Sequence, residues 1–210
     1  MTRTLIIETA TAACSVALIE EGALVAEAHE VVSRGHAERL VPMIASLPGQ
    51  GRAPRILVDC GPGSFTGVRV GLAAARGLAI GWGAEVAGYS SLALIAAAGF
   101  AADPALRALA VVLEGGHGEV FMQRFTAPLL HPDGPFRSLA PAAALAALGE
   151  RPAFGSGVRR LAALDPDLDL RDALPRAAHA LLLTPELAAL PPRPIYGRAP
   201  DAKTLAERGA

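Results

Sequence analysis

The sequence of 210 residues carries 19 Lys and Arg against 20 Asp and Glu, which gives a formal net charge of -1. Hydrophobic residues make up 52% and charged residues 19%, proportions typical of a globular protein and not of a disordered one. A protein that grips nucleic acid unaided usually has a basic excess, so any contact with RNA is expected to be shared with a partner.

The cysteine content and the apolar runs bear on the compartment. Cys14 and Cys60 are the only cysteines, and both fall in apolar segments, so we expect buried, reduced thiols. The N-terminus lacks the pattern of a signal peptide, and no apolar run approaches the roughly 20 residues needed to cross a membrane. These features predict a cytoplasmic protein without a membrane contact.

The first half of the chain predicts three antiparallel strands followed by alternating helices and strands. Apolar runs bounded by small or charged residues indicate the strands, and apolar residues on one face indicate the helices. The expected elements are strands at 4–8, 14–19 and 23–32, a helix at 36–47, a strand at 55–59, a helix at 66–80, a strand at 85–88 and a helix at 90–100.

The second half repeats this order in a weaker form. We expect strands at 106–114 and 119–125, helices at 141–148, 158–164 and 174–190, the last broken near Thr184-Pro185, and a brief strand at 153–155, before a proline-punctuated extended end. A strand that ends in an acid opens each half, at Glu8 and at Glu114. The duplication predicts an α/β protein with two lobes of mixed sheet flanked by helices and a cleft between them.

A glycine-rich turn joins the strand at 55–59 to the following helix, and Ser64 or Thr66 is its predicted N-cap. The turn residues are Gly61, Pro62, Gly63, Ser64 and Thr66. The turn lacks the Lys of a phosphate loop and the G-x-S-x-G of a nucleophile elbow. We therefore favour a structural turn that allows tight helix packing over a phosphate site.

Small residues recur at every fourth position of the helix after this turn, at Gly67, Gly71, Ala75 and Ala79. Residues with this spacing form one ridge, which lets another backbone approach closely. The ridge packs either against the chain's own sheet or against a helix of another molecule, and the periodicity leaves both possibilities open.

Metal chemistry has weak support in the sequence. Glu8 and Glu114 could hold a metal–nucleotide complex in the cleft, but no basic residue is placed to meet a triphosphate, so we favour a structural role. His36 lacks a second His one turn on, because position 40 is Leu. We therefore predict no metal and no cofactor.

Residues 61–71, Gly-Pro-Gly-Ser-Phe-Thr-Gly-Val-Arg-Val-Gly, resemble the signature of the TsaB (YeaZ) family. Segments along nearly the whole chain are also similar to that family: Ile-Ile-Glu-Thr at 6–9, Cys-Ser-Val-Ala-Leu at 14–18, the helix at 33–44, Gly-Glu-Val-Phe at 118–121 and Pro-Ile-Tyr-Gly-Arg at 194–198. The family serves threonylcarbamoylation of adenosine 37 in tRNAs that read codons beginning with A.

The resemblance implies a duplicated actin-like ATPase (ribonuclease H-like) fold, with an N-terminal lobe at 1–103 and a smaller C-terminal lobe at 104–210. It implies a non-catalytic subunit that forms a heterodimer with TsaD and works with the ATPase TsaE, touching tRNA only within the complex. The two N-lobe helices would be the docking face, so the expected partner-binding residues are His36, Arg39, Leu40, Met43, Leu47, Phe65, Gly67, Val68, Gly71, Leu72, Ala75 and Ala79.

The chain departs from the family pattern where an actin-like ATPase handles nucleotide. Glu8 replaces the usual Asp, and Glu114-Gly115-Gly116-His117 replaces an Asp-Ala-Arg-type run. The rival interpretation is an autonomous phosphotransferase or ATPase of the same fold, or a metallopeptidase, and ATP turnover or bound metal in the isolated chain would favour it. A homodimer through the same helices, when no partner is present, is a third possibility.

Overall fold

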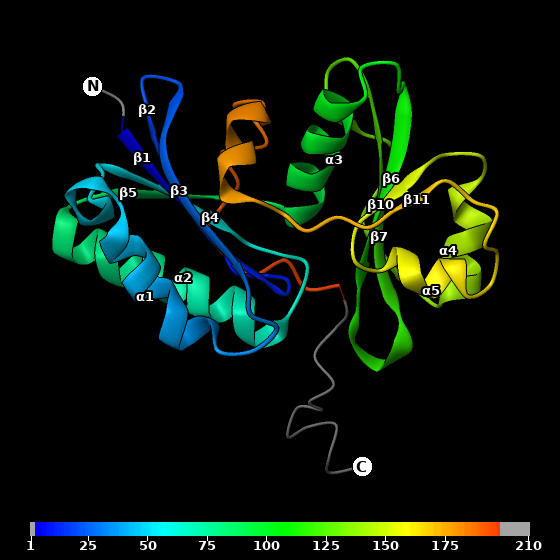
Figure 1. The fold of residues 1–210 in the computed structure, drawn as a ribbon, viewed down its shortest axis with the longest axis horizontal. Helices are drawn as coiled ribbons and strands as arrows, with labels where there is room; N and C mark the ends of the chain where they lie inside the picture. The colour runs from blue at the N-terminus through cyan, green and yellow to red at the C-terminus, as the bar shows by residue number, and fades with distance from the viewer. Residues whose placement is uncertain (1–2, 198–210) are drawn as a thin grey trace, which may run out of the picture.

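The computed structural model describes residues 3–197, which form two mixed β-sheets with helices between and outside them (Figure 1). The first sheet has the strand order β3-β2-β1-β4-β5, in which β1 pairs antiparallel with β2 and parallel with β4. Its strands are β1 (Arg3–Glu8), β2 (Ala13–Glu20), β3 (Ala23–Val31), β4 (Arg55–Asp59) and β5 (Glu85–Tyr89).

The second sheet repeats this topology with shorter strands. Its order is β11-β10-β6-β7-β8, with β9 also pairing with β7, and β6 pairs antiparallel with β7 and parallel with β10. Its strands are β6 (Ala108–Glu114), β7 (Val120–Thr126), β8 (His131–Pro132), β9 (Arg137–Leu139), β10 (Ala153–Phe154) and β11 (Leu170–Arg171). Both halves thus place their first strand at the centre of the sheet, and the predicted duplicated actin-like fold is confirmed.

The helices form layers on both sides of each sheet (Figure 1). The helices α1 (His36–Ser46) and α2 (Phe65–Trp82) cover the outer face of the first sheet. The helix α3 (Ser91–Ala102) and the 3-10 helix η3 (Ala177–Leu182) lie between the two sheets. The outer face of the second sheet is covered by α4 (Pro141–Leu148) and α5 (Val158–Ala162), and short 3-10 turns occupy η1 (Pro48–Gly51) and η2 (Gly116–Gly118).

The central strands are apolar throughout because helices cover both of their faces. Successive side chains of a strand point to opposite faces, so Leu5 and Ile7 contact the α1–α2 layer while Ile6 belongs to the core around η3. In the second sheet, Leu109 packs toward α3 and Ala110 toward α4 and α5. The continuous apolar runs that predicted these strands follow from this double burial.

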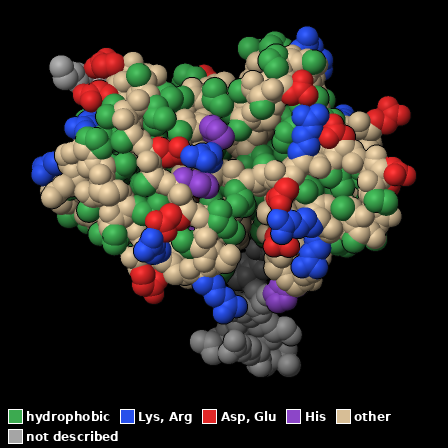
Figure 2. Space-filling view, viewed as in Figure 1, with side chains coloured by type: hydrophobic (Ala, Val, Ile, Leu, Met, Phe, Trp, Pro, Cys, Tyr) green, Lys and Arg blue, Asp and Glu red, His purple; other side chains and the backbone are tan. Residues whose placement is uncertain are grey.

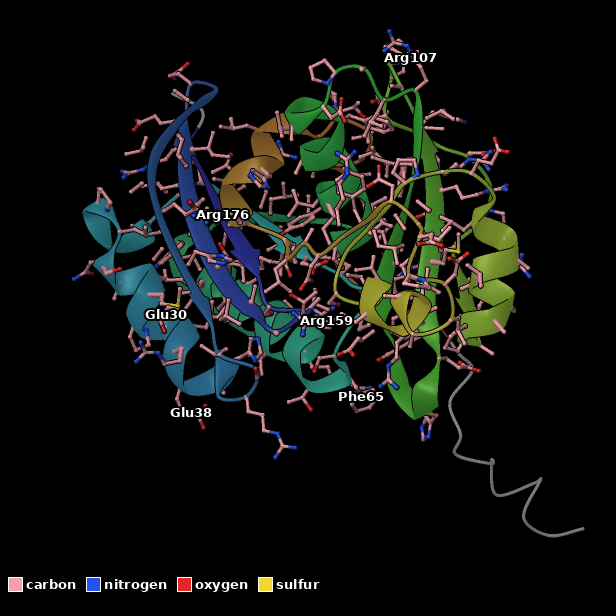
Figure 3. The ribbon with its side chains drawn as sticks, turned by 45° about the vertical axis from the view of Figure 1, so that its right-hand side comes forward. Glu30, Glu38, Phe65, Arg107, Arg159 and Arg176 are labelled. Atoms are coloured by element: carbon pink, nitrogen blue, oxygen red, sulfur yellow. The ribbon has the colours of Figure 1, made fainter. Side chains whose placement is uncertain are left out.

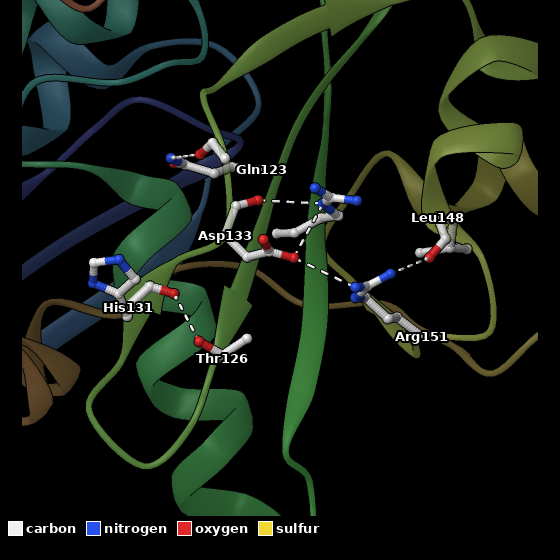
Figure 4. Close-up of polar contacts among 8 residues, drawn as sticks. Gln123, Thr126, His131, Asp133, Leu148 and Arg151 are labelled. Atoms are coloured by element: carbon white, nitrogen blue, oxygen red, sulfur yellow. Dashed lines mark hydrogen bonds and ion pairs between the residues drawn. The ribbon is translucent and has the colours of Figure 1, made fainter.

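Polar contacts brace the outer part of the second lobe. Asp133 Oδ2 lies 3.4 Å from Arg124 Nε and 3.4 Å from Arg151 Nη2, so one carboxylate joins β7, the end of β8 and the loop after α4 (Figure 4). These side chains are partly exposed, which limits each pair to a contribution of about 0–1 kcal/mol.

The predicted helix at 174–190 is wrong in extent. Only η3 forms a helix there, and turns follow it. Pro175 and Pro185 lack the N–H that a continuous helix would use, and Leu190 pairs instead with Gly88 as an isolated β-bridge. The strands β8, β9 and β11 were missed because runs of two or three residues carry no periodicity.

Two segments pack across the predicted boundary between the lobes. The helix α3 contacts β6 and β7, whereas η3 packs back onto β1, β2 and β3. The division into 1–103 and 104–210 stays a prediction, and its last 13 positions, 198–210, lie outside the described residues. None of the helices within residues 3–197 has the length and hydropathy to cross a membrane.

Candidate functional site

The glycine-rich turn packs tightly against the loop between β1 and β2. Ser64 N donates to Ala10 O at 2.6 Å, and a Cβ added at Gly63 would lie 2.0 Å from that same oxygen. The Ser64 side chain accepts a hydrogen bond from Gly67 N at 3.2 Å, so Ser64 is the N-cap of α2, and Thr66 lies inside the helix. Gly63 is therefore required by the close approach of the turn to Ala10, as expected for a structural turn that allows tight helix packing.

The small-residue ridge of α2 packs inside the molecule. A Cβ at Gly67 would lie 2.1 Å from Thr9 O, and a Cβ at Gly71 would lie 2.5 Å from Thr9 Oγ1. Thr9 Oγ1 in turn donates to Gly67 O at 2.8 Å. The ridge therefore serves close approach to the end of β1, which is the first of the two possibilities that the periodicity left open.

Most of the predicted docking residues are buried within the chain. Nine of the twelve predicted partner-binding residues are buried in the chain's own core, because they form the inner faces of α1 and α2: His36, Leu40, Met43, Leu47, Gly67, Val68, Gly71, Leu72 and Ala75. Ala79 is half-buried, and only Arg39 and Phe65 are exposed. These nine residues contact the chain's own core in this conformation, and their role in partner binding stays a prediction.

The exposed side of the same two helices carries large apolar side chains and glycines together with the charged residues Glu38, Arg39 and Arg76. Ile80 is 87% exposed and Val41 57% exposed. A Cβ added at Gly77 or Gly81 would meet no atom within 4 Å, so these two positions face open space on the outer side of α2 and no side chain projects from them. The sequence carried a signal for this surface in a second row of small residues, Ala73, Gly77 and Gly81, which has the same four-residue spacing as the buried ridge.

Three acidic groups are buried at the carboxyl ends of neighbouring parallel strands. Glu8, Asp59 and Tyr89 are fully buried. Glu8 accepts hydrogen bonds from Ala10 N and from the Tyr89 hydroxyl, each at 3.0 Å, and Asp59 Oδ1 accepts from Gly61 N and from Ser91 N at 2.7 and 3.1 Å. This network ties the glycine turn to the start of α3.

The protonation of this pair follows from its burial. Desolvation, together with the neighbouring charge of Asp59, raises the pKa of Glu8 well above its ordinary value, and burial raises the pKa of Asp59 to about 6. A protonated Glu8 can donate to Asp59, whose Oδ2 otherwise has no hydrogen-bond partner among the described residues. Glu8 is therefore a structural group that does not face the cleft.

The other side chains that could bind a metal ion are either buried in the core or far from one another. His36 is buried, with Nε2 3.1 Å from Ala13 O. Within residues 3–197, no three His, Cys, Asp or Glu side chains come together in a way that would hold a metal ion. Burial raises the pKa of the Cys14 thiol to about 11, and both cysteines are buried and free, as expected.

A cleft of about 720 Å³ lies between the two lobes. Its first wall consists of the loop after β1, the glycine turn and the first turn of α2, and its second wall consists of the end of β6 and the start of β7. Glu114 is exposed on the second wall, 3.7 Å from Arg160. Residues 188–197, which we call the C-terminal strap, reach this cleft along the first sheet.

The structure superposes on YeaZ from Pseudomonas aeruginosa with a TM-score of 0.79 and 27% identity, covering 93% of this chain and 100% of that one. It is 36% identical over 129 residues to the tRNA threonylcarbamoyladenosine biosynthesis protein TsaB of Escherichia coli (strain K12). An uncharacterized protein of Mycobacterium tuberculosis is 32% identical over 213 residues, which cover 96% of this chain and 94% of its own.

The chain belongs to the TsaB (YeaZ) family. The match to Escherichia coli TsaB covers 59% of this chain and 54% of that protein, so the chain spans about half the length of the curated TsaB it matches. A family model described as tRNA N6-adenosine threonylcarbamoyltransferase, TsaD, also matches residues 28–127. This TsaB-family chain is therefore related in sequence to the transferase as well.

Proposed function

We propose that the chain is a non-catalytic subunit that forms a heterodimer with the threonylcarbamoyltransferase TsaD and, with the ATPase TsaE, supports threonylcarbamoylation of adenosine 37 in tRNAs that read codons beginning with A. Its similarity to TsaB of Escherichia coli, a tRNA threonylcarbamoyladenosine biosynthesis protein, supports the pathway. The burial of Glu8 supports the absence of catalysis, because a carboxyl group that is enclosed in the core and hydrogen-bonded to Ala10 N and the Tyr89 hydroxyl is not open to a metal–nucleotide complex.

The observation that best supports binding to a partner protein is the exposure of apolar residues on α1 and α2. Large apolar side chains that are exposed together on one surface mark a protein interface, and both Ile80, 87% exposed, and Val41, 57% exposed, lie on this helix pair. We define the docking surface by ten exposed residues of these helices: Ala37, Glu38, Arg39, Val41, Pro42 and Ala45 from α1, and Ala73, Gly77, Ile80 and Gly81 from α2.

The likeness to the transferase supports TsaD as the occupant. The residues that match its family model, 28–127, include both α1 and α2. Two related proteins that present equivalent helix pairs can pack them face to face, as in the self-complementary interface of a two-fold dimer. The same surface would pair two copies of this chain when TsaD is absent.

The test replaces Ile80, the most exposed apolar side chain of the docking surface. We expect Ile80→Asp to weaken binding to TsaD at least tenfold, because burying a branched aliphatic side chain contributes about 1.5–3 kcal/mol and a buried aspartate adds a desolvation cost. Isothermal calorimetry with purified TsaD measures the affinity. Leu129→Asp is the matched control, since Leu129 is 78% exposed in the second lobe.

Two results would contradict the proposal. A folded Ile80→Asp chain that binds TsaD as tightly as the unsubstituted chain would remove the docking surface. ATP turnover or stoichiometric metal in the isolated chain would instead favour the autonomous phosphotransferase or metallopeptidase.

A further inference from the structure

Three side chains stack at the mouth of the cleft. The Arg69 guanidinium lies 3.1 Å from the centroid of the Phe65 ring and 5.6 Å from the centroid of the Tyr196 ring. Arg69 Nη2 also donates to the Tyr196 hydroxyl at 2.9 Å. We call Phe65, Arg69 and Tyr196 the Arg69 cluster. It joins the first turn of α2 to the C-terminal strap.

The two aromatic rings of the cluster are exposed to solvent, and most N–H donors of Arg69 are available for further hydrogen bonds. Phe65 is 66% exposed and Tyr196 51% exposed, which leaves ring surface free for another planar group. Arg69 has five N–H donors, and one of them donates to the Tyr196 hydroxyl. Among residues 3–197, no carboxylate forms an ion pair with Arg69, so its positive charge is not neutralised there. An uncompensated guanidinium stacked on an exposed ring suits an anion that carries an aromatic group.

The second wall of the cleft supplies acceptors. Glu114 and Glu119 line it, and the Ser138 hydroxyl donates to Glu119 Oε2 at 2.6 Å. A phosphate would be repelled by these carboxylates and therefore belongs beside Arg69. Amino groups on the edge of a nucleobase donate hydrogen bonds, which carboxylates accept. The volume of about 720 Å³ is within the range of small-ligand sites and accommodates one nucleotide.

We propose that the Arg69 cluster binds one unpaired nucleotide of the tRNA, with the base stacked on Phe65 or Tyr196 and the phosphate on Arg69. The proposal rests on the proposed function, because it places the RNA contact within the complex with TsaD. Proteins recognise single-stranded RNA by stacking splayed bases on aromatic side chains and on arginine. The formal net charge of -1 explains why this contact would need a partner to be stable.

The geometry favours RNA over a protein at this site. Ile80, the most exposed apolar side chain of the docking surface, is 15 residues beyond Phe65 on α2 and so roughly 22 Å away along the helix axis. Figure 3 places Phe65 at the end of α2 nearest the second lobe, with Arg107 on the opposite side of the molecule. The cluster thus borders the cleft and lies apart from the apolar docking surface.

The experiment measures tRNA binding by the assembled complex with TsaD. We expect Arg69→Ala and Tyr196→Ala to weaken the tRNA affinity about tenfold each, and Arg69→Ala to reduce the salt slope by about 0.7, as loss of one phosphate contact on a single strand requires. Tyr196→Phe keeps the ring and should retain most of the affinity. Arg107→Ala removes the same charge on the far side and should leave affinity unchanged.

The mass of the complex separates this proposal from the proposed function. If the unsubstituted chain forms no complex with TsaD, the proposed function fails. If the complex forms and folded Arg69→Ala and Tyr196→Ala bind tRNA as the unsubstituted chain does, the nucleotide site is refuted. If these substitutions abolish assembly with TsaD, the cluster is a protein contact and the nucleotide site is likewise refuted.

Discussion

Glu8 and Glu114 occupy equivalent positions at the ends of β1 and β6, yet their surroundings give them opposite properties. Glu8 is fully buried beside Asp59, whereas Glu114 is exposed in the cleft. Because burial in a low dielectric disfavours the charged form, the fold raises the pKa of Glu8 above its ordinary value.

This difference predicts how the stability depends on pH. The folded-state pKa of Asp59 is raised to about 6 and that of Glu8 is raised further above its unfolded value, so the folded state binds more protons. The free energy of unfolding is therefore largest below about pH 4 for these groups and falls as the pH rises through 6. We expect Glu8→Gln to stabilise the protein by about 1–3 kcal/mol at pH 8 and to flatten this dependence.

Urea unfolding at pH 5 and pH 8 measures the effect. Glu114→Gln is the matched control, since it alters an exposed glutamate at the equivalent strand end and should leave both midpoints unchanged. An unchanged pH dependence in Glu8→Gln would show that the buried pair does not control it.

At the scale of elements, α2 has small residues on two sides for two different reasons. Gly71 is small because Thr9 Oγ1 occupies the space that a Cβ would need, while a Cβ at Gly77 would meet no atom within 4 Å. The two rows have the same spacing in the sequence. Packing against the sheet, and not periodicity, separates them.

The contrast predicts opposite effects of one substitution. Gly71→Ala should lower the free energy of unfolding by about 1–3 kcal/mol, because the added methyl group overlaps Thr9. Gly77→Ala should raise it by about 0.5–1 kcal/mol, since alanine is the better helix former at an exposed position. Thermal unfolding of both variants measures the difference, and equal melting temperatures would contradict the assignment of the two faces.

The sequence was sufficient for the order of the elements and for the glycine turn, and insufficient for the faces of the helices. Apolar runs such as 14–19 and the cap at Ser64 are local signals, so β2 and the start of α2 were predicted near their observed positions. The apolar spacing of Leu40, Met43 and Ile44 indicates the inner side of α1, but no local pattern reports whether that side packs on the chain's own β2 or on a partner. The exposed cluster around Arg69 was missed because Tyr196 is 127 positions away in the sequence.

At the scale of the whole molecule, the C-terminal strap links the end of the described chain to the centre of the first lobe. Ile195 N donates to Cys60 O at 2.8 Å, and Gly88 and Leu190 exchange two backbone hydrogen bonds. Gly197 packs against Phe121 in the second sheet. On the face shown in Figure 2, acidic and basic side chains are interspersed, so neither lobe presents a large area of one charge there.

The strap predicts a selective change in thiol reactivity. Cys60 Sγ lies 3.7 Å from Pro191 O, beneath the strap, whereas Cys14 lies in the core under α1. A chain shortened to end at Ala189 should therefore react faster with a thiol reagent at Cys60 than at Cys14. A chain that ends at Gly197 is the control. Equal reactivity of the two cysteines in the shorter chain would contradict the expectation that the strap shields Cys60 alone.

The late position of the strap has a consequence for synthesis on the ribosome. Ile195 packs into the core of the first lobe, and η3 covers the inner face of the first sheet. A nascent chain that has emerged only as far as β5 therefore carries an uncovered apolar sheet until residues 177–195 follow. Co-translational folding of the N-terminal half remains incomplete for most of the elongation time, which makes this half a target for chaperones that hold nascent chains.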